Sequence, residues 1–158
     1  MKHNFALALL LLLTLAVLAG CSATSESNTT SKAPAEDTLT IDAQTLTEVP
    51  SFVDWTQDGT VMQLLAMKDA EGQVKVAFNT CQNCNGSPYA WFENVNDTIM
   101  QCQNCGLTFP VSTIGTPRAA GCNPIPVTDF TVSGDTVTVS SQALKNATSL
   151  FTNWKKVQ

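Results

Sequence analysis

The sequence predicts a mostly β domain of the α+β class, a small β-ribbon that carries cysteine knuckles and is followed by one C-terminal helix. Three observations predict it: short β-favouring runs separated by Gly, Asn and Asp turns, a Cys-x-x-Cys motif that occurs twice where such a run ends, and one helical pattern near the end of the chain. We expect the domain to span residues 38–158, which is enough chain for one modest core.

The first twenty residues have the layout of a bacterial lipoprotein signal peptide. Lys2 precedes an apolar run over residues 5–19, and Leu18-Ala19-Gly20-Cys21 resembles a lipobox, in which small residues precede a lipidated cysteine. Residues 21–37 contain no large apolar side chain and predict a flexible tether. The predictions are therefore a signal peptide over residues 1–20, a lipid such as palmitate on Cys21, and a domain anchored to the membrane on the extracytoplasmic side of the cell envelope.

The β-ribbon is predicted from alternating or continuous apolar runs. Residues 38–47 form a first strand, and residues 61–67 and 74–78 form a hairpin around a turn-rich connection. A short strand over residues 98–100 leads into the second cysteine pair, and a strand over residues 107–111 leaves it. Each cysteine pair is thus expected at a strand end.

The end of the chain predicts a second hairpin and the helix. Residues 130–132 and 136–139 flank Ser133-Gly134-Asp135, a tight-turn signal. Ser140 or Ser141 is suited to cap a helix from residue 142 to about 156, whose apolar residues recur at helical spacing. We expect this helix to pack on the sheet.

Charge and histidine content exclude several classes of function. Residues 21–158 contain seven Lys or Arg and thirteen Asp or Glu, a formal net charge of −6, which argues against nucleic-acid binding. The one histidine, His3, lies in the predicted signal peptide. Ser–His and Cys–His nucleophile pairs are therefore excluded from the mature domain, and we do not expect a stand-alone enzyme.

A repeated tetrapeptide carries the functional prediction. Cys81-Gln82-Asn83-Cys84 and Cys102-Gln103-Asn104-Cys105 are separated by seventeen residues, the spacing of a zinc-ribbon-like site. Two cysteines three apart on a turn point both sulfurs into one concavity, so two facing turns can enclose one ion. Gly106 and Asn85-Gly86 follow the pairs and tolerate the positive φ that lets the chain curl back.

Three interpretations of the five mature cysteines remain open at this point. They form disulfides, or one pair acts in thiol–disulfide exchange, or they hold a metal. An odd number of thiols disfavours the first, and the lack of a helical pattern at either pair disfavours the second. A metal centre would contain iron, an iron–sulfur cluster or structural zinc. Cys122, separated from Cys105 by sixteen residues, is then a fifth ligand, a replacement ligand or a reactive thiol.

The motifs together resemble the FtrD-like family of membrane iron–sulfur-containing proteins. The resemblance is carried by residues 74–84, by residues 100–110 with their Cys-x-x-Cys-Gly, and by Gly121-Cys122-Asn123-Pro124-Ile125-Pro126, and it spans about residues 61–127. It implies that the turn over residues 123–126 holds Cys122 against the cluster, and that iron or an iron–sulfur cluster is bound by Cys81, Cys84, Cys102, Cys105 and Cys122. It further implies electron transfer or iron handling beside an iron permease or a membrane redox partner. The rival function is a binding module braced by structural zinc.

Overall fold

The computed structural model describes residues 38–117 and 121–156. The predicted signal peptide, the lipidation at Cys21 and the tether lie outside the described residues. Within those residues no helix has the length and apolar character needed to cross a membrane.

A four-stranded antiparallel sheet forms the middle of the domain, in the order β2-β3-β4-β8. The strands are β2 (Ser51–Gln57), β3 (Thr60–Lys68), β4 (Val74–Cys81) and β8 (Pro124–Pro126). The predicted hairpin is confirmed, because β3 and β4 pair with Leu64 opposite Phe78. The register of β4 against β8 shifts between Phe78 and Cys81, an irregularity of the kind that bends a strand at its end.

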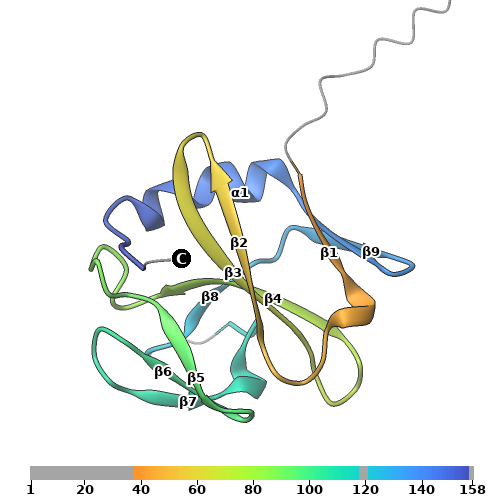
Figure 1. Cartoon of the computed structure of the whole chain (residues 1–158), viewed down its shortest axis with the longest axis horizontal. Helices are drawn as coiled ribbons and strands as arrows, with labels where there is room; N and C mark the ends of the chain where they lie inside the picture. Colours follow the sequence, from red (N-terminus) through yellow and green to blue (C-terminus); the bar gives the residue numbers. More distant parts are fainter. Residues whose placement is uncertain (1–37, 118–120, 157–158) are drawn as a thin grey trace, which may run out of the picture. The chain divides into compact units, whose positions relative to one another are not determined.

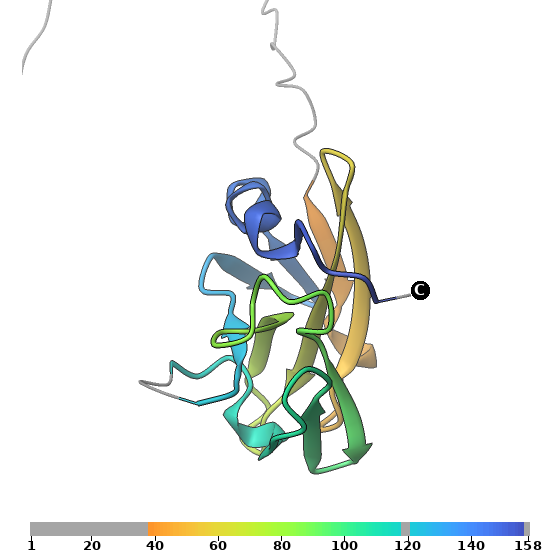
Figure 2. The ribbon, with the colours of Figure 1, turned by 90° about the vertical axis from the view of Figure 1, so that its left-hand side faces the viewer.

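Two three-stranded sheets and one helix complete the fold (Figure 1). One sheet has the order β1-β10-β9, from β1 (Leu39–Asp42), β10 (Thr136–Val139) and β9 (Phe130–Ser133). The other has the order β5-β6-β7, from β5 (Phe92–Asn96), β6 (Ile99–Cys102) and β7 (Thr108–Pro110). Helix α1 (Ser141–Ala147) lies at the end of the domain away from β5, β6 and β7, as Figure 2 also shows.

The middle sheet is buried on both faces, and each face belongs to a different core. Leu64 and Ala66 of β3 pack with Val76 of β4 into a core that also contains residues of β1, β10 and α1. Leu65 and Met67 point the other way, into a core with residues of β5, β6 and β7 and with Cys81, Cys102 and Cys122. Because strand side chains alternate between faces, the continuous apolar run of β3 supplies both cores. The thiols lie in the second core.

The predicted mostly β fold with a C-terminal helix is confirmed, with corrections at several boundaries. The first strand ends at Asp42, because the Asp42 carboxylate accepts the Gln44 N–H at 2.8 Å and caps a 3-10 turn over Ala43–Thr45. The helix, capped by Ser140, ends at Ala147 and continues as a 3-10 turn over Thr148–Phe151. There the Thr148 hydroxyl donates to the Lys145 carbonyl at 2.8 Å, a local bond that competes with the α-helical ladder.

The segment over residues 123–126 was expected as a turn, and this was wrong, because Pro124–Pro126 is the edge strand β8. Val127 donates its N–H to the Val76 carbonyl at 3.0 Å, so Ile125, two residues earlier, also directs its N–H toward β4. The nitrogens of Pro124 and Pro126 then face outward, where a proline costs no ladder hydrogen bond. Strands β2 and β5 were not predicted.

Candidate metal centre

Both cysteine pairs adopt the same backbone turn at the end of a strand. Cys81 ends β4, and the Asn85 N–H donates to its carbonyl at 2.7 Å. Cys102 ends β6, and the Gly106 N–H donates to its carbonyl at 2.8 Å. Gly106 has a φ of 73°, in the left-handed region that favours glycine. The sequence repeat is thus a structural repeat, as its spacing predicted.

Cys122 reaches the site on a third, separately anchored segment. The Gln82 N–H donates to the Asn123 carbonyl at 3.0 Å, which ties the first knuckle to this segment. The Asn123 side chain is fully buried, with Oδ1 3.2 Å from the Thr113 hydroxyl and Nδ2 3.3 Å from the Thr116 carbonyl. Together with the pairing of β8 and β4, these bonds hold Cys122 beside the two knuckles.

All five predicted cysteines are free thiols, and they converge. The Cys122 Sγ lies 2.9 Å from Cys81 Sγ, 3.0 Å from Cys105 Sγ and 4.0 Å from Cys84 Sγ. The sulfurs of Cys81, Cys84, Cys102 and Cys122 all lie within 4.8 Å of one another. Cys81, Cys102 and Cys122 are buried, Cys84 is half-buried and Cys105 is exposed.

The donor set fits a soft metal. Four sulfurs bound at about 2.3 Å to one tetrahedral ion lie about 3.8 Å from each other, and the observed separations fall on both sides of that value. Thiolates are the ligands of iron–sulfur clusters, iron and zinc, so the residues suit the group that the resemblance implies. The separations among these four sulfurs therefore differ from that value by about 1 Å or less.

Burial in uncharged surroundings opposes ionisation of most of these thiols. Burial raises the pKa of Cys102 to about 12, although the N–H groups of Cys105 and Asn104 act against this effect. Burial also raises the pKa of Cys84 and of Cys122. The pKa of Cys105 is lowered, chiefly by its hydrogen bond with Cys122. Residues 79–92 and 98–117 contain no charged side chain, so a bound cation is the charge that would stabilise thiolates here.

Asn104 links the two knuckles, and sequence reasoning missed this role. Its Oδ1 accepts a hydrogen bond from the Ser87 hydroxyl at 2.6 Å, and its amide hydrogen-bonds the Cys84 thiol. Asn83 occupies the same position of the first tetrapeptide and is exposed, without a side-chain hydrogen bond to the described residues. The repeat gave no signal that distinguishes the two asparagines, because only the folded contact does so.

The C-terminal segment supports the first knuckle from outside. The Trp154 indole N–H donates to the Asn79 carbonyl at 3.1 Å, and the Asn153 amide donates to the Gly86 carbonyl at 3.2 Å. The Lys155 N–H donates to the Pro88 carbonyl at 3.0 Å. Asn153 and Lys155 therefore hold the loop that follows Cys84.

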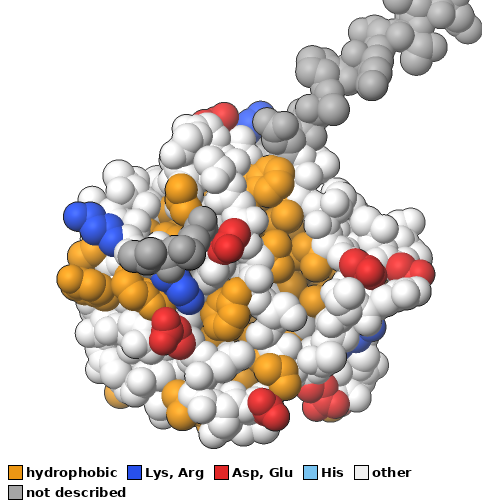
Figure 3. Space-filling model, in the orientation of Figure 1, with side chains coloured by type: hydrophobic (Ala, Val, Ile, Leu, Met, Phe, Trp, Pro, Cys, Tyr) orange, Lys and Arg blue, Asp and Glu red, His pale blue; other side chains and the backbone are white. Residues whose placement is uncertain are grey.

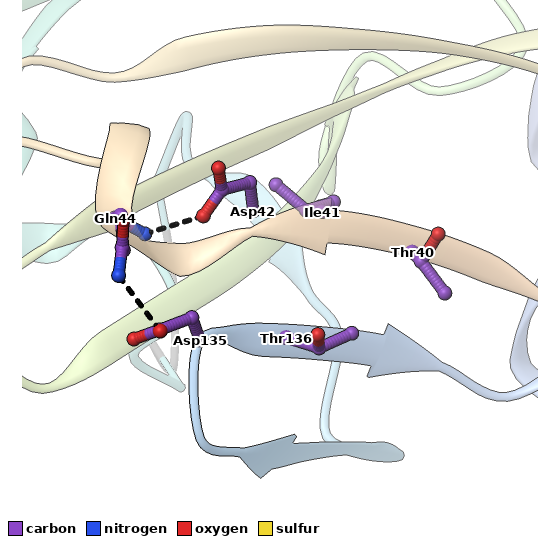
Figure 4. A pocket seen from close by; sticks show the side chains of 6 residues that line it. All are labelled: Thr40, Ile41, Asp42, Gln44, Asp135 and Thr136. Atoms are coloured by element: carbon purple, nitrogen blue, oxygen red, sulfur yellow. Dashed lines mark hydrogen bonds between the residues drawn. The ribbon is translucent and has the colours of Figure 1, made fainter.

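A surface hollow of about 340 Å³ lies elsewhere, between β1 and the turn that joins β9 and β10 (Figure 4). The Gln44 amide donates to Asp135 at 2.7 Å, while its backbone N–H is bound by Asp42. Gln44 is thus bonded to both Asp42 and Asp135, so these residues join two segments of the chain. On the face in Figure 3, the charged side chains are scattered among uncharged ones.

The fold and the sulfur cluster define a cysteine-rich metal-binding β domain. Comparison with family models identifies the family: residues 47–151 match the model described as "Membrane iron-sulfur containing protein FtrD-like", so the chain belongs to the FtrD-like family. This confirms the resemblance drawn from the motifs. Searches of curated proteins and of solved structures found no match.

Proposed function

We propose that the chain is an exported, lipid-anchored protein of the cell envelope that binds iron, as an ion or an iron–sulfur cluster, through Cys81, Cys84, Cys102, Cys105 and Cys122. It serves electron transfer or iron handling for a membrane uptake system, beside an iron permease or a membrane redox partner. The observation that carries this proposal is the convergence of free thiols from three separate segments in uncharged surroundings. The family to which the chain belongs supports iron–sulfur chemistry.

Bound iron would supply a one-electron redox change or a transferable ion, and the protein would supply its environment. The N–H groups of Asn104 and Cys105 hydrogen-bond the Cys102 sulfur and would stabilise its thiolate. The buried side chains of Phe92, Met100 and Phe109 share a core with Cys81, Cys102 and Cys122. They would keep water from the side of the metal site that faces this core. Cys105 leaves the outer side open to solvent.

The test is metal analysis with optical and EPR spectra of the full-length protein purified without oxygen. We expect iron in stoichiometric amount, and an optical spectrum with sulfur-to-iron charge-transfer bands. A colourless, EPR-silent protein with stoichiometric zinc would overturn the iron proposal and favour a structural role. The variant Cys81→Ser, which removes a proposed ligand, should lose the iron. The control variant Cys21→Ser should keep it.

The anchor and the uptake role need separate measurements. Cys21→Ser should release the protein from the membrane fraction, and continued membrane association would contradict the lipid anchor. A deletion strain should grow poorly under iron limitation and be restored by the wild-type gene but not by Cys81→Ser. Normal growth of the deletion strain under those conditions would remove support for iron uptake.

A further inference from the structure

We propose that Cys122, not Cys105, completes the four-sulfur metal site, and that Cys105 is an exchangeable fifth thiol through which metal enters and leaves. This inference rests on the proposed metal binding, and it adds which four sulfurs hold the metal and which one exchanges it. The repeat of two Cys-x-x-Cys motifs pairs Cys84 with Cys105 as equivalent outer ligands. The folded arrangement breaks that equivalence.

The sulfur positions single out Cys122. The four sulfurs that all lie within 4.8 Å of one another are those of Cys81, Cys84, Cys102 and Cys122. Cys122 Sγ contacts Cys81 Sγ at 2.9 Å and Cys105 Sγ at 3.0 Å, so it contacts a buried sulfur of the first knuckle and the exposed sulfur of the second. A sulfur in contact with both knuckles is the natural fourth ligand, and the surplus thiol is then Cys105.

Cys105 and Cys122 also differ in solvent exposure and in how firmly their segments are held. Cys105 lies within residues 103–108, all of which are exposed. Cys122 is only 8% exposed, and its neighbour Asn123 is fully buried and bonded to Thr113 and Thr116. An ion arriving from solvent therefore meets Cys105 before it meets Cys122, and a leaving ion meets it last.

The exchange needs no oxidant or reductant. With a metal bound, the exchange would replace its bond to the Cys105 sulfur by a bond to the Cys122 sulfur, and the proton that leaves the Cys122 thiol would be taken up by the Cys105 thiolate. Release reverses these changes, with Cys105 binding while the Cys122 sulfur is protonated. The two sulfurs lie 3.0 Å apart, so neither knuckle has to unfold for the exchange. The chemistry suits transfer to an acceptor that offers soft sulfur ligands.

The test uses the full-length protein with cobalt(II) as the metal probe, because its visible and charge-transfer bands report tetrahedral thiolate binding. Wild type, Cys105→Ser and Cys122→Ser are compared for stoichiometry, for affinity against a competing chelator, and for the rate of release to it. Cys105→Ser should still bind one cobalt with the bands of tetrahedral thiolate ligation but exchange it severalfold more slowly. Cys122→Ser should lose about 100-fold or more in affinity, since even outer contacts to ligands are worth about 10–100-fold.

The opposite pattern, with affinity lost in Cys105→Ser and kept in Cys122→Ser, would overturn this inference while leaving metal binding intact. A wild-type chain that binds no metal would instead defeat the proposed function itself. Because Cys122→Ser could fail to fold, alkylation of cobalt-loaded wild type followed by mass spectrometry gives a second readout. Cys105 should be modified with cobalt retained. Protection of Cys105 by cobalt, when it is modified in the metal-free protein, would refute its role as the exchangeable thiol.

Discussion

Ser87 donates a hydrogen bond from its hydroxyl to Asn104 Oδ1 at 2.6 Å, and this contact joins the loop after the first cysteine pair to the second pair. Because the Asn104 amide also hydrogen-bonds the Cys84 thiol, Asn104→Ala should weaken metal binding about 10–100-fold. Asn83→Ala is the matched control, since Asn83 has the same place in the repeat but no side-chain hydrogen bond to the described residues. Chelator competition measures both affinities, and equal losses in the two variants would contradict the positioning role.

The Thr80 hydroxyl is buried without a hydrogen-bond partner among the described residues, next to Cys81. Thr80→Val should therefore be neutral or slightly stabilising, because an apolar group of the same shape removes an unpaired polar atom. Thr113→Val should cost about 1 kcal/mol of unfolding free energy, because the Thr113 hydroxyl bonds the Pro110 carbonyl at 2.8 Å. Urea unfolding compares the two variants. A loss at Thr80 as large as that at Thr113 would show that the Thr80 hydroxyl has a partner.

Gly115 and Gly72 have similar positive φ values of 69° and 76°, but only Gly115 faces another strand closely. A Cβ at Gly115 would lie 3.1 Å from the Lys75 Cβ, whereas a Cβ at Gly72 would meet nothing within 4 Å. Gly72→Ala should cost about 1 kcal/mol from backbone strain, and Gly115→Ala about 2 kcal/mol or more from strain and crowding. Thermal and urea unfolding measure the difference. Equal losses of unfolding free energy in the two variants would mean that β4 shifts at Lys75 without cost.

Asp69 gives the domain a defined response to acid. Burial acts to raise the pKa of Asp69, but the Gln73 N–H, the Lys75 ammonium and the Glu71 N–H together hold it below its ordinary value of 3.8. The Lys75 Nζ lies 3.1 Å from the carboxylate. A carboxyl group whose pKa is lower in the folded state stabilises above its unfolded pKa and loses that effect as pH falls through the folded pKa.

Asp69→Asn should therefore lower the melting temperature at pH 7, and the difference from wild type should shrink below about pH 3.8. Melting temperatures recorded from pH 7 to pH 2 test this expectation. Asp97→Asn removes one negative charge at an exposed position that lacks a hydrogen bond or ion pair to the described residues, and it controls for net charge. A difference at Asp69 that stays constant across this range would exclude ionisation as its cause.

The sequence predicted the local parts of the site well, because a Cys-x-x-Cys turn is defined by four neighbouring residues. The hairpin around residues 69–73 and the capped helix were also predictable from nearby signals. The position of Cys122 was not predictable in this way, because Cys122 is 41 residues from Cys81 in the chain and is placed by the pairing of β8 with β4. A three-residue strand with two prolines has the composition of a turn, and only its neighbour makes it a strand.

The two cores explain another limit of prediction. The run from Met62 to Met67 is buried throughout, so its composition indicates a strand without revealing which residues face the cysteines. That assignment follows from alternation once both neighbouring layers are present. In the same way, Asn104 and Asn83 are equivalent in the sequence, and the folded chain distinguishes them because Ser87 and Cys84 lie beside Asn104.

The outward nitrogens of Pro124 and Pro126 affect how the β8 edge can pair with a strand of another molecule. A free sheet edge is a template on which a strand from another chain can add, and here two successive donor positions of that edge are blocked. When several molecules of the protein lie close together on a membrane, a strand of one could not form a continuous row of backbone hydrogen bonds with β8 of another. The segment that brings Cys122 to its place thus also protects this edge of the middle sheet against association with another strand.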